Sequence, residues 1–225
     1  FYHSPGMIYT WITKYLGFTP GKHEGKITGL AAYGNPTTYD IFTKYLQLSK
    51  NGLSYERKIR GFWYLNALEM FRKDLSKYPR EEVASGLQRR FEDVISMHIQ
   101  NWLKLYPQNN IALAGGIFAN VRLNQKILEL PEVDNVFIHP HMSDGGLAVG
   151  AALALWMDLT LDDGKKIIPS KLDNVYFGEE YSDEEIKREL DKNKLNYSYN
   201  KDIEGEVAEL ISKGKVIGRF NGRME

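Results

Sequence analysis

The sequence predicts an α/β fold, and three features of its 225 residues indicate this class. Short apolar runs alternate with segments of helical periodicity, as they do where helices connect neighbouring strands of a parallel sheet. Two of the runs, 111–114 and 136–139, are each followed by a pair of glycines and then by a helical segment. The hydrophobic share of 43% and the charged share of 26% are those of an ordinary folded domain.

The first element expected is a helix. Apolar residues recur at helical spacing from Met7 to Phe18, and Gly17 suits the end of that helix. A glycine-rich loop is expected to follow from Gly21 and to contain Lys26. A lysine in such a loop can reach a phosphate, although a solvated surface lysine is an equally good interpretation.

A hairpin and two helices come next. Lys50-Asn51-Gly52 separates two short runs rich in β-forming residues, which favours a hairpin over 45–55. Helical periodicity then covers 65–77 and 80–105. The longer helix places a row of apolar residues on one face, so we expect that face to be buried.

The centre of the chain is expected to be a strand–helix–strand–helix unit. A buried strand over 111–114 leads through Gly115-Gly116 into a helix over 118–128, and a second strand over 136–139 leads through a loop into a helix over 147–159. Parallel strands joined by a helix are the simplest arrangement for this order.

The composition changes after Leu161, where charged residues and a proline indicate a surface connection. We therefore divide the chain into domains at 1–165 and 166–225. The second part alternates expected strands and helices and is interpreted as the opening of another α/β domain. Its strands are expected at 175–178, 197–199 and 216–220, and its helices at 182–192 and 203–213.

Charge and composition exclude several classes of protein. The 29 basic and 29 acidic residues cancel, so the basic excess typical of nucleic-acid binding is missing. Apolar runs stay well below the ~20 residues that cross a bilayer. Cysteine is absent, which removes thiolate chemistry and is compatible with a reducing compartment. We expect a cytoplasmic protein that binds neither nucleic acid nor membrane.

Gly115 and Gly116 form the first candidate binding feature. Glycines between a strand and a helix let a ligand approach the backbone, and the helix then offers N–H groups and a positive dipole end to a phosphate. Taken alone, the pair is explained as well by a tight turn.

Asp144 is the second candidate. It precedes another glycine pair beyond the end of a strand, where ligands bind in open α/β sheets. Its carboxylate can accept from a ribose, hold a metal or cap the next helix, and capping is the commoner role. His139 and His141 lie close by, but Pro140 separates them and we favour a structural role for both.

Five strings, in order along the chain, resemble motifs of the O-carbamoyltransferases of nodulation-factor, cephamycin and aminoglycoside biosynthesis. These strings are HSPG to YLGF at 3–18, KITGLAAYG at 26–34, AGGIFANVRLN at 114–124, the aspartate–glycine string at 140–153, and GRME at 222–225.

The resemblance implies a fold and a reaction. The first domain would be the C-terminal half of an ATPase domain of the actin/hexokinase/Hsp70 type, similar to the ATPase of tRNA threonylcarbamoylation. The second would begin a domain that handles carbamoyl phosphate. ATP and carbamoyl phosphate would give carbamoyl-adenylate, and the carbamoyl group would pass to a hydroxyl of a sugar, antibiotic or other small molecule. A divalent metal, iron-type or Mg²⁺, would assist nucleotide binding, and a homodimer is possible.

The resemblance also assigns roles to residues. Gly115 and Gly116 would contact the nucleotide phosphates, and Asn120 would support their loop. Gly6 would lie near the ribose or adenine, and Lys26 would face the same cleft. Asp144 would be a metal ligand. The catalytic residues stay unassigned.

Two alternatives stay open. The chain could be a non-catalytic nucleotide-binding module, or it could belong to a relative that carbamoylates a tRNA or protein. Both ends look cut, and the family's H-x-x-x-H metal ligands and its arginines beyond GRME are not in the sequence. We therefore expect this chain by itself to bind metal weakly and to lack full transferase activity.

Overall fold

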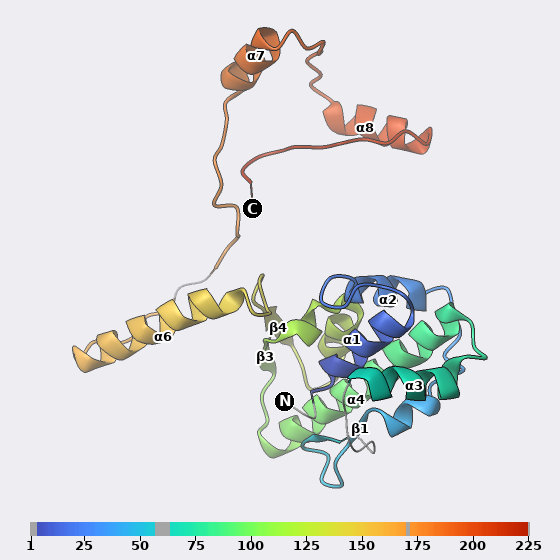
Figure 1. Cartoon of the computed structure of the whole chain (residues 1–225). Helices are drawn as coiled ribbons and strands as arrows, with labels where there is room; N and C mark the ends of the chain where they lie inside the picture. Colours follow the sequence, from blue (N-terminus) through green and yellow to red (C-terminus); the bar gives the residue numbers. More distant parts are fainter. Residues whose placement is uncertain (1–3, 57–63, 170–171, 225) are drawn as a thin grey trace. The chain divides into compact units, whose positions relative to one another are not determined.

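The computed structural model describes residues 4–56, 64–169 and 172–224, with only the backbone of residues 64–66 (Figure 1). His3 and Glu225, which take part in the resemblance, lie outside these ranges. The chain divides into two compact units, Phe1–Lys166 and Ile167–Glu225. Helices and small sheets make up the first unit, so the predicted α/β class is confirmed.

Four helices form the packed body of the first unit. They are α1 (Gly6–Tyr15), α2 (Glu24–Ala31), α3 (Tyr64–Leu75) and α4 (Arg80–Leu105). Their apolar faces meet in one core, in which Ile12, Phe71 and Leu87 are fully buried. Helix α4 packs against α2. Figure 1 shows α1, α2 and α3 gathered around α4.

Helix α1 ends as the sequence predicts. Gly17 has φ +84°, its N–H bonds to the carbonyl of Lys14 at 3.0 Å, and the N–H of Phe18 bonds to the carbonyl of Thr13 at 3.0 Å. These two hydrogen bonds, made where Gly17 takes the left-handed backbone conformation, satisfy carbonyl groups of the last turn of α1.

The glycine-rich loop predicted around Lys26 is wrong, because residues 24–31 form α2. Ile27 is fully buried in the core. The backbone N–H of Gly21 bonds to Glu24 Oε1 at 2.7 Å just before the helix begins. Burying Ile27 offsets the roughly 1 kcal/mol that each helical glycine costs relative to alanine, and Gly25 and Gly29 lie on the exposed side.

The predicted hairpin is confirmed in a short form. After the 3₁₀ turn η1 (Ile41–Lys44), strands β1 (Gln47–Leu48) and β2 (Tyr55–Glu56) pair antiparallel. Gly52 has φ +72° in the connecting turn, which explains the glycine at that position.

The central unit has the predicted parallel wiring. Strand β3 (Asn110–Leu113) pairs in parallel with β4 (Asn135–Ile138), with Leu113 opposite Ile138. Between them lie the 3₁₀ turn η2 (Gly116–Ala119) and helix α5 (Val121–Leu128). Leu123 and Ile127 of α5 are fully buried, so α5 is anchored in the same core as α4.

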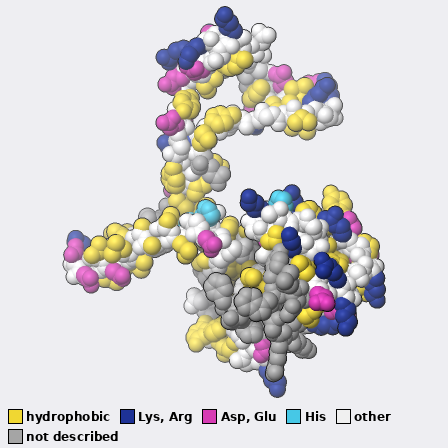
Figure 2. Space-filling view, viewed as in Figure 1, with side chains coloured by type: hydrophobic (Ala, Val, Ile, Leu, Met, Phe, Trp, Pro, Cys, Tyr) yellow, Lys and Arg dark blue, Asp and Glu magenta, His cyan; other side chains and the backbone are white. Residues whose placement is uncertain are grey.

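Helix α6 (Gly146–Asp162) follows the second glycine pair, as predicted. None of its described side chains is buried, and apolar side chains follow its length (Figure 2). A bilayer-spanning helix is not found in the described ranges of the chain.

The second unit contains α7 (Asp183–Lys192) and α8 (Ile203–Ser212). The predicted capping box is present, since Ser182 accepts from the N–H of Glu185 and Glu185 accepts from the N–H of Ser182. The strands predicted at 175–178, 197–199 and 216–220 are wrong: residues 172–224 hold no strand as described. A strand needs a ladder partner, and here a single backbone bond joins Gly178 to Met224.

Candidate functional site

The two glycine turns of the first unit meet at the ends of β3 and β4. Gly115 has φ +114°, a conformation that glycine adopts freely, and its N–H bonds to the carbonyl of Met142 at 2.7 Å. A Cβ on Gly116 would lie 3.2 Å from Ser143 Oγ. The parallel pairing therefore brings the loop that precedes Asp144 against the Gly115-Gly116 turn.

The start of α1 reaches the same place. A Cβ on Gly6 would lie 3.1 Å from Ile117 Cγ2, which belongs to η2 directly after the glycine pair. A larger residue at position 6 would push against this turn. The structure thus brings Gly6 and Ser143 against the turn that contains Gly116 and Ile117.

Asn120 fixes the beginning of α5. Its side-chain oxygen accepts from the N–H of Leu123 at 3.1 Å, which makes it the N-cap, and its exposed fraction is 9%. It also exchanges two hydrogen bonds with Gln88 of α4: Gln88 Nε2 donates to Asn120 Oδ1 at 3.1 Å, and Asn120 Nδ2 donates to Gln88 Oε1 at 2.9 Å. These contacts hold the beginning of α5 against α4.

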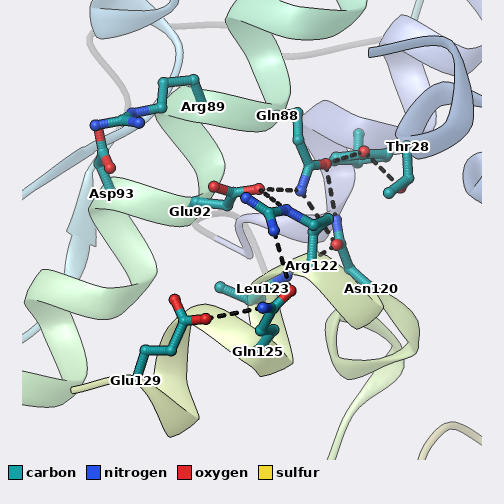
Figure 3. Close-up of polar contacts among 11 residues, drawn as sticks. Thr28, Gln88, Arg89, Glu92, Asp93, Asn120, Arg122, Leu123, Gln125 and Glu129 are labelled. Atoms are coloured by element: carbon teal, nitrogen blue, oxygen red, sulfur yellow. Dashed lines mark hydrogen bonds and ion pairs between the residues drawn. The ribbon is translucent and has the colours of Figure 1, made fainter. Parts of the chain in front are cut away.

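Gln88 is the centre of a buried polar network (Figure 3). Its Oε1 also accepts from the hydroxyl of Tyr9 at 2.5 Å, and its Nε2 also donates to Glu92 Oε1 at 2.8 Å. The Tyr9 hydroxyl lies 2.9 Å from Thr28 Oγ1 of α2. Burial raises the pKa of Tyr9 well above its usual value, so its hydroxyl stays protonated.

Glu92 brings a carboxylate into this network. Its side chain is only 6% exposed, and Oε1 lies 3.9 Å from Nε of Arg122 on α5. Arg122 is 55% exposed and also donates to Gln125 Oε1 at 3.0 Å. The buried acid is therefore balanced by one half-exposed guanidinium and by the Gln88 amide, as a buried charge requires.

A pocket of about 390 Å³ opens above the network between α2, α4 and α5. Arg89 of α4, which pairs with Asp93 at 3.1 Å, stands at this pocket together with Arg122. The lining combines an apolar side with polar and charged groups: Thr28, Ala31, Ala32, Pro36, Ser85, Gln88, Arg89, Glu92 and Arg122. Gln88 lines the pocket and also bonds to Asn120, so hydrogen bonds connect the pocket lining to the beginning of α5.

Comparison with known proteins decides the family. Residues 1–153 match the family described as carbamoyltransferase N-terminus. The chain belongs to the carbamoyltransferase family. The resemblance found in the sequence motifs is thereby confirmed, and the matched range includes every candidate residue of the site.

Individual relatives support the same assignment. The chain is 34% identical to the uncharacterized protein MJ1058 of Methanocaldococcus jannaschii, over 99% of the chain and 37% of the relative. It is 30% identical to the nodulation protein NolNO of Sinorhizobium fredii, over 99% of the chain and 33% of the relative. A tRNA N6-adenosine threonylcarbamoyltransferase of Thermosipho melanesiensis is 32% identical over 55% of the chain and 35% of the relative. The chain thus spans about a third of the length of these relatives.

Asp144 lies in the turn before α6 of the carbamoyltransferase chain, exposed to solvent. It does not cap that helix, because the N-cap is Gly145 and no side chain bonds there. In the described part of the chain its carboxylate makes no hydrogen bond or ion pair. No group of three or more metal-binding side chains occurs among the described residues.

Lys26 does not join the residues that line the pocket. It lies on α2, and its Nζ is 5.8 Å from the centre of the Phe18 ring. Arg80 stacks over the same ring at 4.9 Å, so this end of α2 is occupied by cation–π contacts. Of the predicted nucleotide contacts, the structure therefore gathers Gly6, Gly115, Gly116 and Asn120, and sets Lys26 apart.

Sequence reasoning missed the residues of α4 that complete the site. Gln88 and Glu92 are four residues apart on the face that is otherwise apolar, which is an unusual place for a carboxylate and an amide. That interruption of the apolar face was the available signal. Arg122 belongs to the string at 114–124 that resembles the family motif, but the resemblance assigned it no role.

Proposed function

We propose that this chain is the nucleotide-binding part of an O-carbamoyltransferase that uses ATP to activate a carbamoyl group. The observation that carries the proposal is that Gln88, which lines the pocket, is hydrogen-bonded to Asn120, the N-cap of the helix that comes after the glycine turn and η2. A nucleotide has a flat base and sugar at one end and phosphates at the other, and the site offers a different surface for each end.

The pocket suits the nucleoside end. Guanidinium planes such as those of Arg89 and Arg122 stack on aromatic rings, and a purine has such a ring. The hydroxyls of Thr28 and Ser85 and the carboxylate of Glu92 supply acceptors for ribose hydroxyls or an exocyclic amine. A volume of about 390 Å³ falls within the usual range for small-molecule sites.

The glycine turn suits the phosphate end. Gly115 and Gly116 are exposed and carry no side chain, so phosphate oxygens can approach the backbone at the beginning of η2. Asp144 is one residue beyond Ser143, which contacts the turn. When bound, a divalent metal would neutralise phosphate charge there.

The described residues suit Mg²⁺ better than an iron-type ion. Mg²⁺ is commonly held by one or two carboxylates together with substrate phosphates and water, and Asp144 can be such a carboxylate. An iron-type site built from the protein needs several ligands, and the described residues bring no such group together. We propose that Asp144 contributes one ligand to a metal that the nucleotide brings.

In the proposed reaction, water cleaves carbamoyl phosphate to carbamate and phosphate, and carbamate then attacks the α-phosphate of ATP to form carbamoyl-adenylate and release pyrophosphate. A hydroxyl of a sugar, antibiotic or other small molecule takes the carbamoyl group from the adenylate, and AMP leaves. A relative that modifies tRNA is the second candidate, since threonylcarbamoyltransferases match 55% of the chain. The match to NolNO over 99% of the chain and the zero net charge favour the small-molecule acceptor.

The test is pyrophosphate release from ATP by the full-length protein, with and without carbamoyl phosphate. We expect release that depends on carbamoyl phosphate and that falls about tenfold in Arg122→Ala, the size of one lost charged contact to the nucleotide. Arg72→Ala on the exposed side of α3 is the matched control and should keep the wild-type rate. ATP binding without carbamoyl-dependent release would favour the non-catalytic module, and absence of ATP binding would overturn the proposal.

A further inference from the structure

The amide of Gln88 is saturated with hydrogen bonds, although it lies beside a pocket that a ligand could enter. Its oxygen accepts from Tyr9 and Asn120, and its nitrogen donates to Glu92 and Asn120. Two acceptor sites and two donor sites are the full capacity of an amide. Gln88 is 6% exposed, so none of these bonds is replaced by water without cost.

This saturation fixes which way the amide points. The oxygen has to face the Tyr9 hydroxyl, because the nitrogen has to face the Glu92 carboxylate, which can only accept when ionised. Asn120 is then held in one orientation by the reciprocal pair, and its Oδ1 accepts both from Gln88 Nε2 and from the N–H of Leu123, which caps α5. The network therefore transmits the orientation of one amide to the first turn of α5.

The contacts also connect the two ends of the site. Glu92 and Arg122 stand at the pocket, while Asn120 caps α5 and donates its backbone N–H at 3.2 Å to the carbonyl of Ile117 in η2, the turn that begins at Gly116. Gln88 is the residue between them (Figure 3). Tyr9 adds a bond from α1, three residues after Gly6, and it does not line the pocket.

We propose that Gln88 is a positioning residue that sets the Gly115-Gly116 turn for phosphate through Asn120. The inference rests on the proposed nucleotide function and adds a residue to it. A residue with this role matters most for ligands that carry phosphates, because a nucleoside fills the pocket without using the turn. A residue that only stabilises the fold would affect both kinds of ligand alike.

The experiment compares ATP with adenosine. Dissociation constants for both are measured by calorimetry on the full-length protein, and the ratio of the adenosine constant to the ATP constant is the readout. In Gln88→Glu the nitrogen donor is lost and a second carboxylate faces Glu92, so we expect this ratio to fall about tenfold. Gln100→Glu, at an amide of α4 that bonds to Glu132 outside the pocket, is the matched control and should leave the ratio unchanged.

Tyr9→Phe keeps the test valid if Gln88→Glu fails to fold. It removes only the hydroxyl that bonds to Gln88 and Thr28, and the ratio should fall about threefold, in keeping with one lost neutral hydrogen bond. A ratio within twofold of the wild-type value in each folded variant overturns the role of Gln88 while ATP binding by the wild type still supports the proposed function. Failure of the wild type to bind ATP overturns both.

Discussion

The two sides of the candidate site are built differently. On the helical side, Asn120, Gln88 and Glu92 are buried, and hydrogen bonds join them across α4 and α5. On the loop side, Asp144 is exposed and makes no hydrogen bond or ion pair within the described residues. The Gly115-Gly116 turn lies between the two and contacts the loop side through Met142.

This difference indicates that the two sides of the site have different roles. The helical side has its geometry before any ligand arrives, because Asn120, Gln88 and Glu92 are each held by hydrogen bonds and by burial. The loop side keeps its charged group available, so a ligand or metal can engage it without breaking an existing bond. Substitutions on the helical side should therefore act first on stability, and those on the loop side on binding alone.

The largest expected effect is that of Asn120→Ala on the free energy of unfolding. The substitution removes the N-cap of α5 and both hydrogen bonds to Gln88, so the buried Gln88 amide loses two of its partners. We therefore expect the free energy of unfolding, measured by urea denaturation, to fall by about 3 kcal/mol. Asn135→Ala removes an exposed side-chain bond to Asn110 and should cost less than about 0.5 kcal/mol. Equal losses in the two variants would contradict the contrast between the sides.

A smaller effect is expected from pH in the helical body. Partial burial opposes ionisation of Asp74, but bonds from Lys44 and Tyr45 outweigh it and hold the pKa of this carboxyl below its usual value. A lowered folded-state pKa stabilises the protein above the unfolded-state pKa of about 3.9, and this contribution is lost as the pH falls through the folded-state pKa.

The variant Asp74→Asn isolates that contribution. It should lower the free energy of unfolding by about 1 kcal/mol at pH 7, and the difference from the wild type should shrink as the pH falls below about 4. Chemical denaturation at a series of pH values measures it. A difference that grows toward low pH would mean that the sign of the linkage is wrong.

The smallest effect on stability is expected on the loop side. Asp144→Asn keeps the shape of an exposed side chain without partners, so the free energy of unfolding should change by less than about 0.5 kcal/mol. ATP affinity measured with Mg²⁺ should fall several-fold, whereas affinity measured in EDTA should not change. A drop of the same size in EDTA would show that Asp144 acts without a metal.

Much of the first unit could be predicted from the sequence. Periodicity located α1 and α4, and the strand–glycine–helix pattern located β3, the turn and α5. These elements carry strong local signals that agree with their tertiary contacts. The Gly115-Gly116 turn meets the loop that contains Met142 and Ser143 because β3 pairs with β4 in parallel, as the same pattern predicts.

Other features depend on contacts that local patterns do not encode. Helix α2 contains two glycines and is held by the burial of Ile27, so composition alone favoured a loop. Around Gln88, hydrogen bonds join side chains that lie 32 and 79 positions apart in the sequence, and no local motif predicts these contacts. In residues 172–224 the strand-like segments lack a ladder partner, which propensity does not reveal.

The most direct test of the nucleotide site is calorimetric titration of ATP and Mg²⁺ into the full-length protein and its Gly116→Ala variant. The added methyl group lies 3.2 Å from the movable Ser143 hydroxyl, so the fold should tolerate it, yet it occupies the surface that phosphate should approach. Gly25→Ala, at an exposed position of α2 with nothing within 4 Å of the new Cβ, is the control. We predict at least a tenfold loss of ATP affinity in Gly116→Ala, about 1.4 kcal/mol or more, and wild-type affinity in Gly25→Ala. Wild-type affinity in a folded Gly116→Ala protein would contradict a phosphate site at the Gly115-Gly116 turn.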